Sequence, residues 1–252
     1  MKEIRSVKNN KIKELRKLQQ RKYRNQAESY LLEGYHLVEE AVNAHAAVQE
    51  VYLDERGLQL WQDWVEEHQL DYYFFSDEVM NALSDLPTPQ GIIALVKKEE
   101  EKPANFSGKW LLLDNVQDPG NVGTIVRTAD AAGFDGVFLG EGSADRYSSK
   151  VLRSMQGSQF HLPVLSGDVK KVIPEIKRTG SKVYGTQLDP AALSYKQVEK
   201  HSSFALILGN EGQGVDEEIL QLTDQNLYIP IYGAAESLNV GVAAGILMYA
   251  LI

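Results

Sequence analysis

The stretch WLLLDNVQDPGNVGTIVR, residues 110–127, passes from an apolar run through a proline–glycine turn into a helical pattern. The run 110–113 is typical of a strand, and the turn is favoured because proline presets φ and glycine accepts positive φ. Asn121 is a candidate cap for the following helix, and Arg127 falls about two turns into it. An arginine there can grip a phosphate or polarise an oxygen. Taken alone, the stretch also fits an ordinary strand–turn–helix unit with a surface arginine.

Two further polar loops also follow apolar runs. Glu211 lies in the glycine-rich turn 208–212, where it can meet a cation, accept a hydroxyl hydrogen bond, hold Arg127, or simply be an exposed acid. Ser237 and Asn239 lie in the loop that follows 227–231 and precedes an apolar helix. Both are N-cap formers, and since one cap suffices, the other is available to a ligand. Three such loops after successive strands predict one site at the carboxyl ends of a sheet.

Composition narrows the class of protein. The chain has 252 residues, 43% of them hydrophobic and 24% charged, as in an ordinary globular protein. It has no cysteine, which excludes disulfides, thiolate metal sites and cysteine nucleophiles. The five histidines are not closely paired, so we expect no metal. The charged start argues against a signal peptide, and the apolar run 240–252 is too short to span a bilayer. We expect a cytoplasmic protein without a membrane segment.

Charge is distributed unevenly along the chain. Residues 1–24 hold ten Lys/Arg against two Glu, a net +8, which leaves −17 on the remainder. Ile12, Leu15 and Leu18 recur three apart after Asn9 or Asn10, so this arm is predicted to be a helix with one apolar stripe. A basic helix on an acidic body suits RNA phosphates, while a solvated amphipathic helix is the alternative. The candidate RNA-binding residues are Lys11, Lys13, Arg16, Lys17, Arg21, Lys22 and Arg24.

Alternating strand and helix patterns predict an α/β protein of two domains. In the first half, 48–53, 72–75 and 91–96 are predicted strands, and 58–68 and 77–86 are predicted helices. The charged segment 97–103, which ends in proline, is the best linker. Beyond it the alternation restarts, with strands at 136–139 and 183–186 and a helix at 168–178. The predicted domains are residues 1–102 and 103–252.

Together the three loops resemble the signature motifs of the SpoU-type RNA 2′-O-ribose methyltransferases of the SPOUT superfamily. Order and spacing agree, and the resemblance covers nearly the whole chain. In the second half it is carried by 118–130, 208–214 and 229–240. In the first half, which resembles the family's substrate-binding domain, it is carried by 10–13, 32–34 and 88–92.

The resemblance implies a C-terminal domain with a deep trefoil knot, preceded by a small ribosomal-protein-like RNA-binding domain. It implies S-adenosylmethionine as cofactor, contacted by Gly209, Ile229 and Leu238, and a homodimer. The basic arm then has RNA as its partner. Ribosomal RNA is preferred over transfer RNA as the substrate because a whole RNA-binding-like domain precedes the catalytic one.

The family's reaction implies roles for the polar residues. Arg127 is expected to hold a phosphate or stabilise the developing alkoxide, because a guanidinium is always protonated and is no simple base. Asn121 is expected to position the ribose or Arg127, and Glu211 to fix Arg127 or its loop. Ser237 and Asn239 are expected to orient the substrate hydroxyl and the cofactor pocket. The alternatives are a transfer RNA methyltransferase, a non-catalytic RNA-binding protein with this fold, and a nucleotide-dependent oxidoreductase, against which the poor G-x-G-x-x-G match counts.

Overall fold

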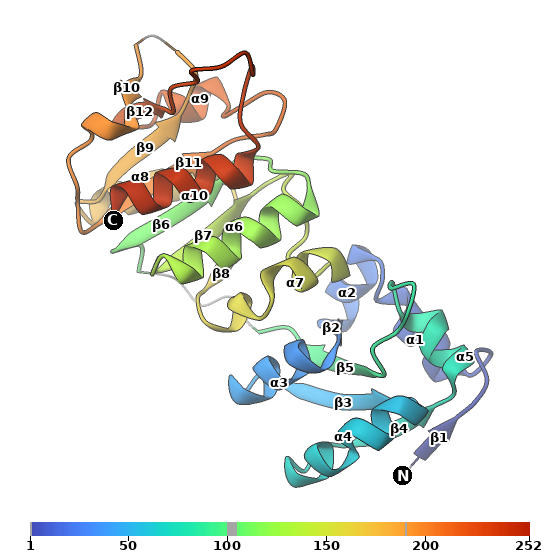
Figure 1. Cartoon of the computed structure of the whole chain (residues 1–252). Coiled ribbons are helices and arrows are strands. Elements are labelled where there is room, and N and C mark those ends of the chain that lie inside the picture. The colour runs from blue at the N-terminus through green and yellow to red at the C-terminus, as the bar shows by residue number, and fades with distance from the viewer. Residues whose placement is uncertain (1, 100–104, 190) are drawn as a thin grey trace. The chain divides into compact units, whose positions relative to one another are not determined.

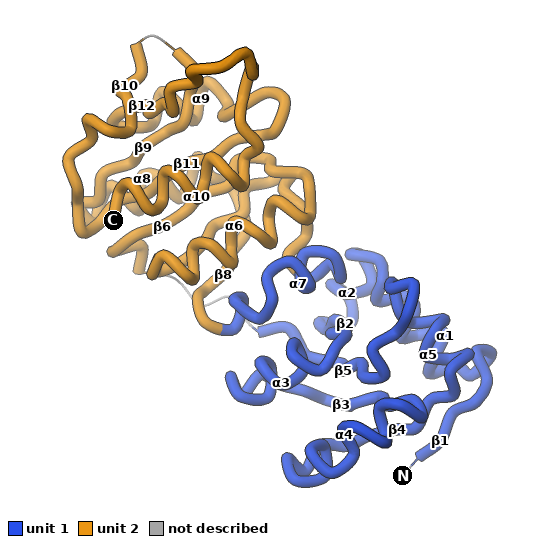
Figure 2. Tube along the Cα trace, viewed as in Figure 1, with its two compact units in different colours: residues 1–100, 147–160 blue, residues 101–146, 161–252 orange. Residues whose placement is uncertain are grey.

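The computed structural model describes residues 2–99, 105–189 and 191–252 (Figure 1). The chain divides into two compact units, drawn in different colours in Figure 2. Unit 1 comprises residues 1–100 together with 147–160, and unit 2 comprises residues 101–146 and 161–252. Most of the predicted linker, residues 100–103, lies outside the described residues, and Lys97 ends a strand.

Unit 1 is built on a five-stranded sheet of order β1-β4-β3-β5-β2, in which β5 runs antiparallel to both of its neighbours. Its strands are β1 (Lys2–Ile4), β2 (Ser29–Glu33), β3 (Val48–Leu53), β4 (Tyr72–Phe75) and β5 (Ile92–Lys97). The α/β alternation predicted for this half is confirmed. The three-residue strand β1 was not predicted, because it is defined by its parallel pairing with β4 rather than by a local pattern.

The helices of unit 1 are α1 (Asn10–Lys17), α2 (Arg21–Ala27), α3 (Tyr35–Asn43), α4 (Glu55–Glu67), α5 (Asp77–Leu83) and α7 (Ser149–Met155). The predicted apolar stripe of the arm is confirmed, since Ile12, Leu15 and Leu18 are buried in one cluster with Phe75 and Met80. Asn9 caps α1 by accepting a 2.8 Å hydrogen bond from the Lys11 N–H. A helix whose only apolar stripe is buried presents its basic residues to solvent.

The segment 147–160 leaves the C-terminal half of the chain and packs within unit 1. Its helix α7 contacts β2, and the rings of Tyr147 and Tyr30 lie 4.7 Å apart. Ser149 donates a hydrogen bond to Asp85, and Gly157 lies against Glu40. The division of the chain into residues 1–102 and 103–252 therefore differs from the structure in this segment. This segment packs against residues that are distant in sequence, and such contacts do not change the local composition from which a domain boundary is predicted.

Unit 2 is a seven-stranded, all-parallel sheet of order β10-β12-β9-β11-β6-β7-β8. Its strands are β6 (Lys109–Leu113), β7 (Gly136–Gly140), β8 (Val164–Gly167), β9 (Lys182–Thr186), β10 (Leu193–Ser194), β11 (Phe204–Leu208) and β12 (Gln225–Tyr228). Central strands of such a sheet are buried on both faces and read as continuous apolar runs, as β6 and β11 do. The apolar run 227–231, which precedes the third polar loop, is only partly a strand. The strand β12 ends at Tyr228, because Pro230 has no N–H to donate to a neighbouring strand.

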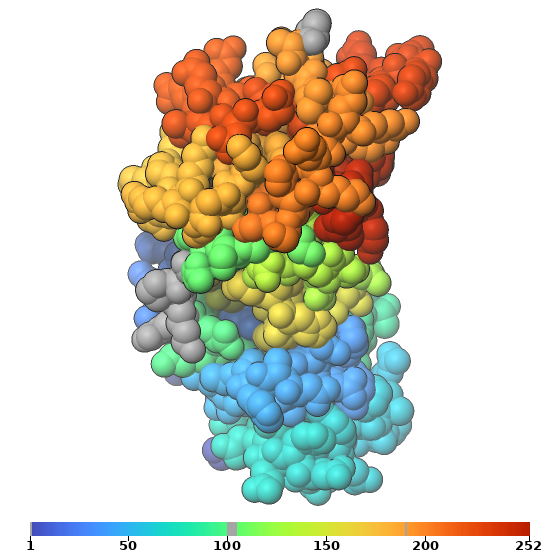
Figure 3. Space-filling model, turned by 90° about the vertical axis from the view of Figure 1, so that its left-hand side faces the viewer, coloured from blue at the N-terminus to red at the C-terminus, as the bar shows by residue number. Residues whose placement is uncertain are grey.

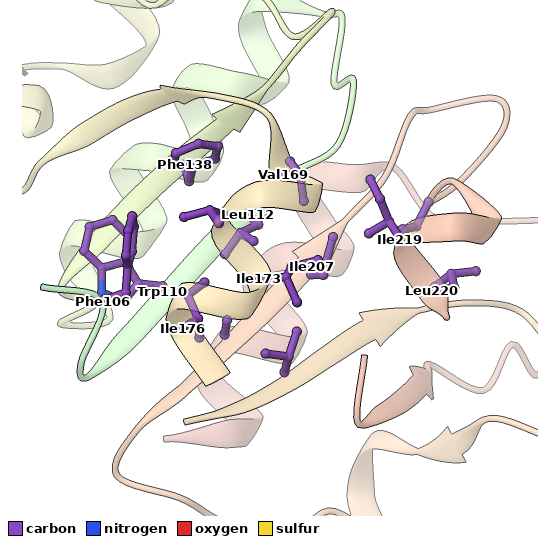
Figure 4. Packing of buried hydrophobic residues seen from close by; sticks show 14 residues of the cluster. Phe106, Trp110, Leu112, Phe138, Val169, Ile173, Ile176, Ile207, Ile219 and Leu220 are labelled. Atoms are coloured by element: carbon purple, nitrogen blue, oxygen red, sulfur yellow. The ribbon is translucent and has the colours of Figure 1, made fainter. Parts of the chain in front are cut away.

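Helices cover both faces of this sheet. On one face α8 (Val169–Arg178) and α9 (Glu217–Leu220) bury apolar side chains, and Figure 4 shows Ile176 of α8 beside Trp110 and Ile173 beside Ile207. The helices α6 (Pro119–Ala131) and α10 (Val240–Leu251) pack together (Figure 1). The C-terminal segment, dark red in Figure 3, is visible at the surface. The Lys200 ammonium donates to the Ile252 carbonyl at 2.6 Å.

The register of the central strands sets the place of the site. Leu208 pairs with Leu113, so β11 and β6 end level, and the Asp114 N–H donates to the Leu208 carbonyl at 2.8 Å. The first two polar loops therefore leave the sheet side by side. The third leaves β12, which is separated from β11 by β9.

Candidate functional site

The first loop starts α6 with a cap that differs from the prediction. The Asp118 carboxylate accepts the Asn121 N–H at 2.9 Å, and Pro119 occupies the first helical turn. The prediction that Asn121 caps this helix is wrong, because the aspartate three residues earlier already takes that position. The Asn121 side chain is thereby left to make contacts with the other two loops.

Glu211 joins the second loop to the first. Its carboxylate accepts the Asn121 amide at 3.0 Å and the backbone N–H groups of Asp118 and Gln117 at 3.1 and 3.3 Å. Glu211 is expected to fix either Arg127 or its loop, and these hydrogen bonds fix the loop. No hydrogen bond or ion pair between Glu211 and Arg127 is found in the described part of the chain. The acid serves to fix the turn that begins α6.

Hydrogen bonding also sets the protonation state of Glu211. Partial burial by itself raises the pKa of this carboxyl group. The Asn121 amide and the backbone N–H groups favour the charged form, and their combined effect is larger, so the pKa lies below its usual value. Glu211 is therefore ionised at neutral pH and binds the loop as a carboxylate.

Asn239 joins the third loop to the same network. Its amide donates to the Asn121 carbonyl oxygen at 3.0 Å, while its own oxygen caps α10 by accepting the N–H groups of Gly241 and Val242 at 2.9 and 3.3 Å. One cap does suffice, and it is Asn239. Ser237 is exposed and makes no hydrogen bond with any described residue. The prediction that the three loops form one site is confirmed by the chain of contacts Glu211–Asn121–Asn239.

Arg127 is exposed on α6, about two turns from the network. Within the part of the chain that the structure describes, it has no carboxylate or carbonyl partner. An exposed guanidinium at the edge of a polar site is suited to an anion from outside, and its planar fork matches a phosphate.

A cavity of about 550 Å³ lies beside the second and third loops. Gly209, Ile229 and Leu238, the three predicted cofactor contacts, all line it, together with Thr186, Gln187 and Leu208. A volume of this order is within the range of roughly 300–1,000 Å³ that small-molecule sites have. Gly209 lacks a side chain that would cover the backbone there. The lining combines apolar side chains with polar ones such as Thr186, Gln187 and Ser237, and this mixture fits a cofactor that carries a nucleoside and a charged amino-acid part.

Sequence reasoning missed several residues that support the site. Asn210 accepts the N–H groups of Gly212 and Gln213, and its amide donates to the Asn115 carbonyl at 2.9 Å. Thr186 and Gln187 line the cavity because β9 lies next to β11. The Asp–Pro pair at 118 and 119 was a readable signal for the helix cap. The order of the strands in the sheet could not be predicted from the sequence.

The candidate RNA-binding residues of unit 1 fall into four groups, of which the buried Arg24 is the last. Lys13, Arg16, Arg21 and Lys22 are exposed, as predicted for phosphate contacts. Lys17 is exposed and paired with Glu14 at 2.7 Å. Lys11 is half-buried, donates to Glu50 at 2.8 Å and lies 4.3 Å from the centre of the Tyr73 ring. These contacts leave Lys11 less available to RNA than the exposed group.

The position of Arg24 contradicts its prediction as an RNA-binding residue. Its side chain is only 4% exposed, and its guanidinium donates to the carbonyls of Leu18 and Gln19 at 2.8 Å each. These carbonyls lie just beyond α1, where a helix leaves acceptors unsatisfied. Arg24 therefore holds α1 and α2 together and does not present its charge to a ligand.

Two classes of site are not found among the described residues. No group of three or more histidine or acidic side chains is arranged to hold a metal ion. No helix there is both long and apolar enough to cross a membrane.

Comparison with known proteins agrees with this geometry. The profile of the SpoU rRNA Methylase family matches residues 109–249, and that of the MRM3-like substrate binding domain matches residues 9–94. The chain is 47% identical to the 23S rRNA (guanosine(2553)-2'-O)-methyltransferase RlmP of Bacillus subtilis, over 99% of this chain and 98% of that protein.

Two solved structures with bound AdoMet share the fold. An rRNA methyltransferase from Sinorhizobium meliloti has a TM-score of 0.89 at 27% identity, with 99% of this chain and 97% of that chain covered. The SpoU methyltransferase AviRb from Streptomyces viridochromogenes has a TM-score of 0.87 at 25% identity, with 97% of each chain covered.

Proposed function

Because the chain belongs to the SpoU rRNA methylase family, we propose that it methylates the ribose of a guanosine in 23S ribosomal RNA. The chain is an S-adenosylmethionine-dependent RNA ribose 2′-O-methyltransferase. The choice of 23S RNA and of guanosine rests on its 47% identity to RlmP over nearly the full length of both proteins. The match of residues 9–94 to a substrate binding domain supports a role of this half of the chain in binding the RNA.

The contacts Glu211–Asn121–Asn239 beside the cavity carry the proposed mechanism. When bound, S-adenosylmethionine would supply a methyl group on a positively charged sulfur for transfer to the ribose 2′-oxygen, whose proton would pass to water. Gly209, Ile229 and Leu238 would hold this cofactor, as residues that line the cavity.

Arg127 is proposed as the catalytic residue. Its guanidinium would bind the phosphate next to the target and stabilise the negative charge that develops on the 2′-oxygen. Ser237, whose hydroxyl has no partner in the described chain, would orient the 2′-hydroxyl. The side chains of Glu211 and Asn239 each form a hydrogen bond with the side chain of Asn121. These three residues would act as positioning residues.

The exposed residues of α1 and α2 would bind the RNA backbone. Lys13, Arg16, Arg21 and Lys22 are near neighbours in sequence and carry no acidic partner among the described residues, so each can neutralise a phosphate. RNA binding is then expected to weaken steeply with salt.

A homodimer is proposed from the surface of α10. Val242 and Tyr249, seven residues apart and so on one helical face, are 53% and 55% exposed. Ile252 at the chain end is 38% exposed. Apolar side chains gathered on one helix favour burial against a second copy. The trefoil knot implied by the resemblance stays a prediction. A cytoplasmic location stays a prediction.

The function is tested by mapping 2′-O-methylation. Purified protein, S-adenosylmethionine and unmodified total RNA are incubated, and modified riboses are located by sequencing. We expect one guanosine in 23S RNA. Arg127→Ala should lower turnover about 100- to 1,000-fold, as loss of a charge-stabilising donor does elsewhere. It should leave cofactor binding intact, and Arg127→Lys tests whether charge alone is enough. Methylation of transfer RNA alone would favour the first alternative, and cofactor binding without transfer to any cellular RNA would favour a non-catalytic protein.

A further inference from the structure

The loop between β12 and α10 has a tip that stands outside the cofactor cavity. Ile229, Ile231 and residues 236–238 line the cavity, whereas residues 232–235 do not. The tip is Tyr-Gly-Ala-Ala, so Tyr232 is its only large side chain. A Cβ placed at Gly233 would meet no atom within 4 Å, which shows how open this part of the loop is.

Tyr232 has no internal structural task. Its side chain is 87% exposed, more than any other large apolar side chain of the described residues. Within the described chain it makes no hydrogen bond, no contact with another ring and no contact with a cation. A large aromatic residue left in water gains nothing for folding, and this one lies in the same loop as Ser237, beside the cavity.

The three loops of the site otherwise lack an aromatic ring. Residues 118–127, 208–214 and 229–239 include a single aromatic residue, which is Tyr232. The polar side chains of these loops bond to one another or face solvent, and Arg127 is suited to a phosphate. None of them offers an aromatic face to a base. Proteins that recognise a nucleotide in a loop or bulge of folded RNA splay its base out of the stack and hold it on an aromatic side chain.

We propose that Tyr232 binds the target nucleotide by stacking its ring on the splayed base. The proposal rests on the proposed function, because it assumes that RNA is the substrate. Stacking tolerates any base, so Tyr232 supplies position and affinity rather than base identity. Its place five residues before Ser237 keeps the stacked base and the ribose hydroxyl within reach of one loop.

The test uses the full-length protein and an RNA fragment that carries the methylation site mapped for the wild type. Tyr232→Ala should lower kcat/KM for RNA about 10- to 100-fold, the effect of losing one base–aromatic stack. Tyr232→Phe should stay within about twofold of wild type. Leu60→Ala is the matched control, since Leu60 is an apolar residue 51% exposed on α4 in unit 1. Cofactor affinity should be unchanged in all three variants.

A second substrate tests the contact itself. RNA with an abasic residue at the target keeps the ribose 2′-hydroxyl but has no base. The loss caused by the abasic target and the loss caused by Tyr232→Ala should not add, because each removes one partner of the same contact. Additive losses, or wild-type kcat/KM for Tyr232→Ala, would overturn the proposal. A loss that coincides with a change of oligomeric state in light scattering would overturn it in favour of a contact with a second copy. Absence of methylation by the wild-type protein would instead refute the proposed function.

Discussion

Replacing Gly209 by alanine is expected to disrupt the second loop, while the same change at Gly212 in that loop is expected to be tolerated. A Cβ at 209 would lie 2.1 Å from the Gly214 carbonyl carbon and 2.2 Å from the Val215 nitrogen, whereas ordinary contact begins at 3.4 Å. A Cβ at 212 would meet only the Asn210 side-chain oxygen, at 3.7 Å.

The size of the effect follows from what must move. The obstructing atoms are backbone, and Asn210 and Gly214 exchange two hydrogen bonds of 2.9 Å that would have to open. Overpacking costs about 1–3 kcal/mol, and each lost hydrogen bond costs about 1 kcal/mol. We therefore expect Gly209→Ala to lower the free energy of unfolding by about 3 kcal/mol, which is roughly 6–12 °C in Tm for a domain of this size.

Thermal unfolding and calorimetric titration with S-adenosylmethionine measure the two consequences. Gly209→Ala should show the lower Tm and weaker cofactor binding, because Gly209 lines the cavity. Gly212 also lines the cavity, and the variant Gly212→Ala should keep a Tm within about 1 °C of wild type. Equal Tm values for the two variants, or a larger loss for Gly212→Ala, would refute the steric reasoning.

Three further predictions concern other parts of the chain. Arg24→Ala should lower the free energy of unfolding by about 2–4 kcal/mol, because two carbonyls lose a charged donor, whereas Arg21→Ala should leave Tm unchanged and reduce the salt dependence of RNA binding in filter assays. Glu211→Gln should lower Tm at neutral pH. Since folding lowers the pKa of Glu211, its contribution is complete above about pH 4.5 and is lost as the pH falls through the lowered value, so the two Tm curves should converge in acid. Tyr249→Glu should convert the proposed dimer to monomer in light scattering, because a charge would be buried in an apolar interface.

Each of these predictions has a result that contradicts it. A stable Arg24→Ala protein with weaker RNA binding would mean that Arg24 contacts RNA and does not stabilise the fold. A constant Tm difference down to pH 3 would mean that the Glu211 carboxylate is not what holds the loop. A Tyr249→Glu protein with the oligomeric state of the wild type would remove the α10 face as the interface.

Local patterns were sufficient for most of the elements. The runs 48–53 and 72–75 are strands with the predicted bounds, since alternation and β-branched or aromatic residues are local properties. Helix starts were less exact. The helix predicted at 58–68 begins at Glu55, because Asp54 caps it through the Gly57 N–H at 2.8 Å. An aspartate ahead of the apolar pattern, at 54 and again at 118, marks the helix start more exactly than the pattern does.

The sequence by itself determined the α/β class, the three loops and the family, because turn residues and apolar runs act within a few positions of themselves. Only the tertiary structure decided which side chains in those loops bond to each other. Asn121 and Glu211 are 90 residues apart, and they meet because β6 and β11 pair in one register. The same holds for Arg24, whose burial depends on how α2 returns to α1, and for α7, which packs in unit 1. Such contacts depend on strand order and helix packing, which no short stretch of sequence encodes.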